Sequence, residues 1–74
     1  MGKDIQITFM QARIVRLATQ EWHLTMQSVN ALFRRYGIYA YIEKFWDLFH
    51  IEGDMAVLQD VRQYLEKKGA AIGN

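Results

Sequence analysis

The sequence predicts an all-α protein that folds as a compact bundle of about four short helices. Apolar residues recur every three to four positions through most of the 74 residues, which is the period of a helix with one buried face. The chain has no proline. Three glycines, Gly37, Gly53 and Gly69, each follow a periodic segment, where a helix can end in a left-handed cap.

The first two helices are expected to fill residues 4–36. The first runs from Asp4 to Trp22, because one broad face gathers Ile7, Met10, Ile14, Val15, Leu17, Ala18 and Trp22. The second begins at Thr25, a residue type that caps helix N-termini well. Its apolar positions are Met26, Val29, Leu32, Phe33 and Tyr36.

The third helix follows Gly37 almost at once and is expected to be central. About half of its circumference is apolar, with Ile38, Tyr41, Ile42, Phe45, Trp46, Leu48 and Phe49. The fourth helix is expected to start at Asp54 as its N-cap. It aligns Val57, Leu58, Val61, Tyr64 and Leu65 on one face.

The length allows one domain, which we place at residues 1–69, with residues 70–74 as a flexible tail. Hydrophobic residues make up 51% of the chain, which is enough to drive folding. There is no cysteine, so packing must hold the fold without disulfides or thiolate-bound zinc. Short connections favour successive helices that pack against each other.

The sequence predicts a cytoplasmic protein with no membrane association. Its first residues lack the apolar core of a signal peptide. The longest uncharged apolar stretch, residues 38–42, is far shorter than the ~20 residues that span a bilayer. The net charge is +1, but residues 1–36 carry five basic and two acidic side chains while residues 37–74 carry four and six. The basic half could meet an acidic partner or be an ordinary solvated surface.

From Tyr36 onward the sequence resembles a family of short bacterial proteins, domain of unknown function 3791. The resemblance rests on Tyr36-Gly37, residues 46–50, Gly53, Asp60-Val61, Tyr64-Leu65 and Lys68-Gly69. Residues 5–35 agree in pattern and length. The family usually has tyrosine at Trp46, leucine at Phe49 and a small polar residue at Ile51, so these departures blur any transfer of function.

The resemblance implies a helical fold with no established activity, cofactor or catalytic residue. It also implies an accessory or antitoxin-like role beside a neighbouring protein that resembles a toxin. That implication is an analogy and does not come from the residues themselves.

The residues do not predict catalysis, a cofactor or a metal site. His50, Glu52 and Asp54 cluster near one loop, with Asp47 one turn earlier, but their spacing matches no metal motif. Ser28 has no histidine within a helical turn and fits a role in helix capping. We therefore expect a protein that is not an enzyme.

Nucleic-acid binding is the alternative function. Residues 25–49 could form a helix-turn-helix whose third helix enters the major groove. In a different route, Arg34 and Arg35, with Arg13 and Arg16, could contact the DNA backbone without sequence specificity. The solvent face of the third helix, however, carries Glu43, Lys44, Asp47 and His50. With neutral histidine, the net charge of this face is not positive. Such a face is expected to be repelled by DNA.

A second apolar stripe on the first helix predicts contact with another protein. Ile5, Phe9 and Ala12 lie opposite the main apolar face, and Arg13 and Arg16 flank them. The stripe could also be used inside the bundle. Tyr39 and Trp46 share one edge of the third helix, and we expect both to be partly exposed.

The sequence therefore predicts a small non-enzymatic protein-interaction module. Its partner is either another protein or a second copy of itself.

Overall fold

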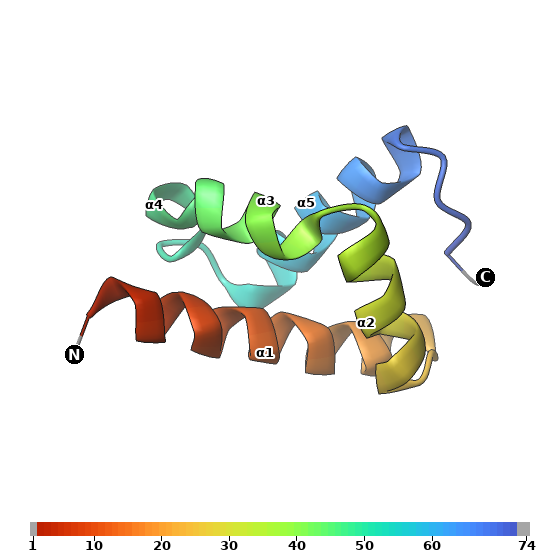
Figure 1. Ribbon diagram of the computed structural model, residues 1–74, viewed down its shortest axis with the longest axis horizontal. Coiled ribbons are helices and arrows are strands. Elements are labelled where there is room, and N and C mark those ends of the chain that lie inside the picture. The colour runs from red at the N-terminus through yellow and green to blue at the C-terminus, as the bar shows by residue number, and fades with distance from the viewer. Residues whose placement is uncertain (1, 73–74) are drawn as a thin grey trace.

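The computed structural model describes residues 2–72, which fold into helices packed around one core. The elements are α1 (Lys3–Trp22), α2 (Met26–Arg35), α3 (Ile38–Lys44), α4 (Trp46–Phe49) and α5 (Asp54–Lys67). Helix α1 runs along one side of the molecule, α3, α4 and α5 lie on the other side, and α2 closes one end (Figure 1). No strand occurs in the part of the chain described, so the all-α prediction is confirmed.

The helix ends follow local chemistry at most of the expected positions. The Thr25 hydroxyl accepts a hydrogen bond of 3.0 Å from the Ser28 backbone N–H, which confirms the cap of α2. Gly37 and Gly69 have φ angles of 68° and 87°, the left-handed conformation that glycine adopts most easily. The prediction that Gly53 ends a helix in the left-handed conformation is wrong. Gly53 has a φ of −75°, it occupies the N-cap position, and Asp54 is the first helical residue of α5.

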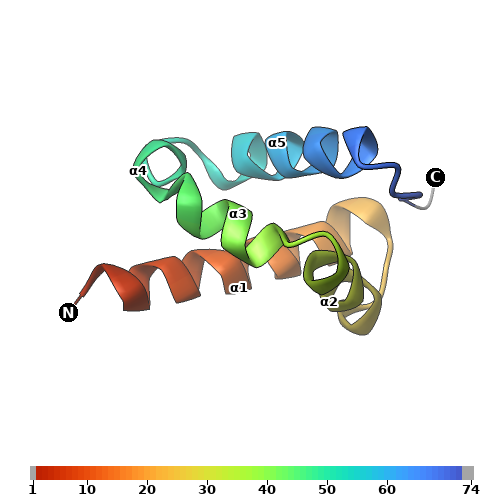
Figure 2. The same ribbon diagram turned by 45° about the horizontal axis from the view of Figure 1, so that its top comes forward.

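The predicted third helix is divided at Phe45. This residue has φ −103° and ψ 19°, and it ends α3 and precedes α4. Beyond the break, Trp46 and Phe49 of α4 are both buried in the core. The break turns the chain toward α5. Helix α5, which has 14 residues, then packs beside α1 (Figure 2).

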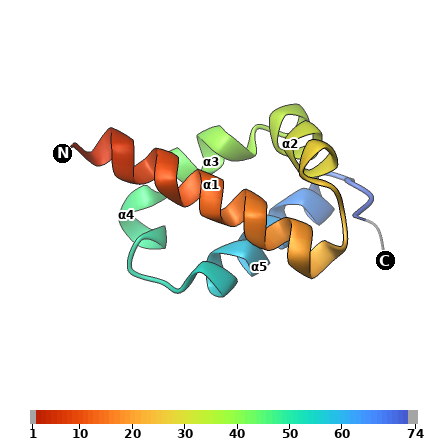
Figure 3. The same ribbon diagram turned by 90° about the horizontal axis from the view of Figure 1, so that it is seen from below.

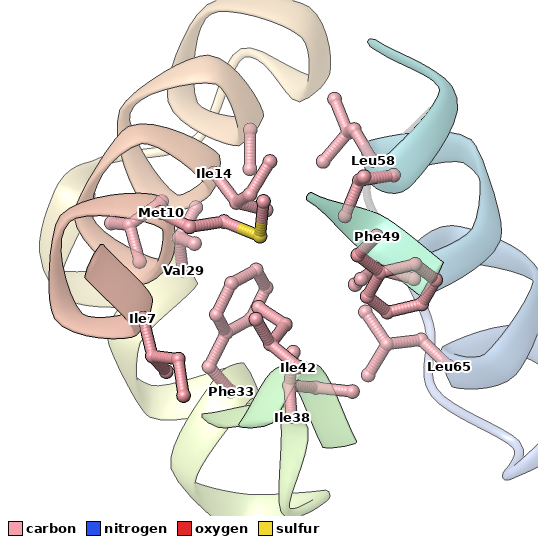
Figure 4. Close-up of a cluster of buried hydrophobic side chains, with 14 of the residues drawn as sticks. Ile7, Met10, Ile14, Val29, Phe33, Ile38, Ile42, Phe49, Leu58 and Leu65 are labelled. Atoms are coloured by element: carbon pink, nitrogen blue, oxygen red, sulfur yellow. The ribbon is translucent and has the colours of Figure 1, made fainter. Parts of the chain in front are cut away.

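The core draws apolar side chains from every helix, as the close-up in Figure 4 shows. Its members are Ile7, Met10, Ile14, Val15, Ala18, Trp22, Val29, Phe33, Ile38, Ile42, Trp46, Phe49, Val57, Leu58, Val61 and Leu65. Phe33 stands edge-on to both Trp22 and Tyr39, with ring centres 6.4 and 5.6 Å apart. Such edge-to-face pairs add stability beyond their buried area.

We expected a flexible tail from residue 70. Ala70 and Ile72 lie partly buried against the core. The Ala70 backbone N–H donates to the Leu65 carbonyl oxygen at 3.0 Å. Residues 73 and 74 of the expected tail lie outside the described residues.

Candidate interaction surface

The outer face of α1 carries the apolar stripe that the sequence indicated. Ile5 is 38% exposed, Phe9 is 58% exposed, and Ala12 is also exposed. In the view of Figure 3, α1 lies in front of the other helices, and none of them covers its outer face. The possibility that the stripe packs inside the bundle is therefore wrong for this chain.

A groove with a volume of about 570 Å³ lies beside this stripe, between α1 and α2. Its lining residues are Thr8, Gln11, Ala12, Val15 and Arg16 of α1, Met26, Gln27 and Asn30 of α2, and Tyr39 of α3. Ala12 belongs to both features, so the stripe and the groove form one continuous surface. We call the stripe residues Ile5, Phe9 and Ala12 together with this groove the α1 surface.

Met26 was predicted to lie on the apolar face of its helix, but it is 55% exposed. Met26 is exposed because it lies in the first turn of α2, where its side chain lines the groove instead of entering the core. Sequence reasoning also missed Thr8, Gln11, Gln27 and Asn30. No signal in the sequence marks them, because the groove depends on how α1 and α2 cross.

The floor of the groove is held by hydrogen bonds to Tyr39. The Gln11 side-chain N–H donates to the Tyr39 carbonyl oxygen at 2.9 Å, and the Tyr39 hydroxyl donates to the Asn30 side-chain oxygen at 2.7 Å. Burial raises the pKa of the Tyr39 hydroxyl above its ordinary value, and the nearby Arg34 guanidinium offsets part of that rise. These bonds tie α1, α2 and α3 together around the groove. They make it a preformed feature.

Charged groups lie at both ends of the α1 surface. Arg16 lines the groove, and Arg34 lies close enough to Tyr39 to act on it electrostatically. Asp4 and Glu43 line a smaller pocket near the start of α1. None of these four groups forms an ion pair within residues 2–72.

Arg13, the other predicted flanking residue, is exposed but already paired. Its guanidinium contacts the Asp54 carboxylate at 3.0 Å, so it links α1 to the start of α5. The pair joins residues 41 positions apart. Arg13 therefore serves the fold as well as bordering the stripe.

Trp46 does not lie where its predicted interface role requires. It is only 8% exposed, and its ring stacks on His50 with ring centres 4.8 Å apart. The expectation of partial exposure is wrong for Trp46, because the break at Phe45 turns α4 so that this side chain enters the core. Tyr39, the second aromatic of that edge, is partly buried.

Further exposed apolar side chains lie between Phe45 and the start of α5, and sequence reasoning assigned some of them to the core. Phe45 and Leu48 are exposed, as are Ile51 in the following loop and Met55 in α5. Ile51 is the most exposed of them at 73%. Its position two residues before Gly53 in a connection is a signal of exposure that the sequence does contain.

Three of the polar residues near that loop, Asp47, His50 and Asp54, have partners for their side chains. The Lys3 ammonium lies 3.5 Å from the Asp47 carboxylate, and His50 Nδ1 lies 2.8 Å from the Trp46 carbonyl oxygen. Among residues 2–72, no three His, Cys, Asp or Glu side chains group closely enough to hold a metal ion. Ser28 contacts the Thr25 hydroxyl at 3.0 Å, beside the cap of α2.

The two arginines of the nucleic-acid alternative are exposed at the end of α2. The Arg35 guanidinium lies over the Tyr36 ring, 5.5 Å from its centre. Helix α3, which would be the recognition helix, has seven residues and ends before Phe45. In the described part of the chain, no helix is both long and apolar enough to cross a membrane.

The sequence model of a family described as protein of unknown function (DUF3791) matches residues 9–68. The chain belongs to the DUF3791 family. The match begins within α1 and ends just after α5, so it also covers the first half of the chain, where the resemblance was one of pattern alone. The DUF3791 region includes Phe9, Ala12 and most of the groove. No curated protein and no solved structure matches this chain.

Proposed function

We propose that this DUF3791 chain is a non-enzymatic protein-interaction module that binds another protein through the α1 surface. The observation that carries the proposal is the exposure of Phe9, at 58%, next to a preformed groove. Covering the exposed part of Phe9 contributes roughly 1–2 kcal/mol of apolar transfer free energy. A few such anchors beside a groove provide most of the energy in a typical protein interface.

The chemistry of the groove supports binding over catalysis. Its lining contains apolar side chains, three amides, the Thr8 hydroxyl, the Arg16 guanidinium and the Tyr39 phenol. It therefore lacks the paired nucleophile and base, or the paired carboxylates, with which most enzymes act. A groove between two helices instead suits an apolar side chain from a partner helix.

Two other roles from the sequence have less support. The helix-turn-helix alternative relies on α3, which is short and places Glu43 beside Lys44 on its exposed side. An antitoxin-like role beside a neighbouring protein, which the family resemblance implies, would use the same α1 surface. That role is therefore a special case of the proposal.

A binding experiment with two matched variants tests the proposal. The natural chain, Phe9→Asp and Ile51→Asp each serve as bait, and bound proteins are identified by mass spectrometry. Ile51 is a suitable control because it is also an exposed apolar residue but belongs to the connection between α4 and α5 and not to the α1 surface. We expect a partner to bind the natural chain and Ile51→Asp and to be lost with Phe9→Asp. A differently tagged copy of the chain itself counts as such a partner.

The opposite pattern would contradict the proposal. If every bound protein is retained by a folded Phe9→Asp chain, the α1 surface is not the binding site. Circular dichroism of each bait shows that the helices are intact.

A further inference from the structure

We propose that the occupant of the α1 surface is a second copy of this chain, bound about a two-fold axis with the two α1 helices antiparallel. The proposal rests on the proposed function, since it names the partner of the same surface. Its basis is that one face of α1 carries both a projecting side chain and a matching recess.

Phe9 is the projection and Ala12 is the recess. Phe9 is the more exposed of the two large apolar side chains in the stripe, and Ala12 is its smallest member and lines the groove. They are three residues apart on the same face, which is about 4.5 Å along a helix. A two-fold axis midway between them would place Phe9 of each copy on Ala12 of the other.

Such self-complementarity is what a two-fold interface requires, because the same patch must serve on both sides. To bind a different protein, the α1 surface would need only a projection or only a recess, and not both at this spacing. The position of Ala12 at the edge of the groove also gives the incoming Phe9 ring a place beside Val15 and Met26.

The charges favour the antiparallel direction. Asp4 and Glu43 lie near the start of α1, whereas Arg16 lines the groove farther along the same helix. The same two-fold axis pairs position 16 of one copy with position 5 of the other, next to Asp4. A parallel pair would instead bring Arg16 close to Arg16, and like charges would repel.

The expected complex is weak. A helix of 20 residues is about 30 Å long, and a pair of such helices buries less than the roughly 800 Å² per partner that is typical of stable complexes. We therefore expect a dissociation constant on the order of 10 µM. The exchange between monomer and dimer is then visible over an ordinary concentration range.

Complementary variants test the geometry in sedimentation velocity experiments. Phe9→Ala leaves two recesses, and Ala12→Phe leaves two projections. We expect each variant alone to dimerise at least about tenfold more weakly than the natural chain. In an equimolar mixture, a mixed dimer again sets one phenylalanine against one alanine at both of its contacts. We expect the mixture to regain natural affinity within about threefold.

Controls separate this inference from the proposed function. Ile51→Asp should dimerise like the natural chain, and thermal unfolding shows that both α1 variants are folded. A natural chain that stays monomeric at about 500 µM, or a mixture that does not recover, overturns the second-copy inference. If a different protein is still lost with Phe9→Asp, the proposed function stands without this inference. If no partner depends on Phe9, both are wrong.

Discussion

Two adjacent residues of α1, Phe9 and Met10, give the sharpest test of its two faces. Phe9 is 58% exposed and Met10 is 2% exposed, although both are large apolar side chains in the middle of one helix. Met10→Ala leaves a cavity in the core and is expected to lower the free energy of unfolding by about 2–5 kcal/mol. The total free energy of unfolding of a domain of this length is roughly 4–11 kcal/mol, so this loss is severe.

Phe9→Ala is expected to change the free energy of unfolding of the monomer by less than about 0.5 kcal/mol. It loses partial contacts, but alanine has a higher helix propensity than phenylalanine by roughly 0.5 kcal/mol, which offsets that loss. Urea unfolding followed by circular dichroism measures both variants. The protein is kept near 1 µM, about tenfold below the expected dissociation constant, so that association does not contribute.

The thermal midpoint should fall by at least about 8 °C for Met10→Ala and hardly move for Phe9→Ala. The reasoning is refuted if both variants destabilise the dilute protein equally. Phe9 would then belong to the core, and the α1 surface would not exist as described.

Three further predictions concern the turns, Tyr41 and nucleic acid. Gly37→Ala should cost about 1–2 kcal/mol, because φ is 68° there. Gly53→Ala should cost less than about 1 kcal/mol, because alanine fits a φ of −75° but is a poorer N-cap residue than glycine, and urea unfolding compares the two variants. The Tyr41 hydroxyl donates to the Asp60 carboxylate at 2.8 Å, and burial followed by this bond raises the pKa of Tyr41 to about 12. Since the pKa is higher in the folded state than the unfolded value of 10.0, the contribution of Tyr41 to stability should be complete below pH 10 and be lost as the pH rises from 10 toward 12. Tyr41→Phe should remove that part of the alkaline loss in unfolding curves measured across this range, and an unchanged pH dependence would contradict the assignment. In gel retardation at about 50 mM salt the natural chain should leave DNA duplexes unshifted, while a shift that disappears in Arg34→Ala/Arg35→Ala would favour the nucleic-acid alternative.

The sequence was sufficient for most helix bounds because the determinants are local. Thr25 caps α2 through its own hydroxyl, and Gly37 adopts the left-handed conformation that its position indicated. The break at Phe45 was not predictable in this way, because neither proline nor glycine lies there. The break is tied to tertiary packing, in which Trp46 and Phe49 both enter the core.

The candidate site was predictable only in part, and for a related reason. The stripe of Ile5, Phe9 and Ala12 follows from helical periodicity within one element. The groove does not, because it forms where α1 and α2 meet and its floor depends on Tyr39 of α3. The periodicity that located Phe9 could not show that Trp46 would be buried.

Photo-crosslinking at position 9 in the native cells tests the contact role of the α1 surface most directly. A photoreactive phenylalanine derivative replaces Phe9 in one version and exposed Gln63 of α5 in another. We expect a covalent adduct from position 9, with twice the 8.7 kDa mass of the chain if the partner is a second copy, and no comparable adduct from position 63. Equal or absent crosslinking at the two positions would contradict it.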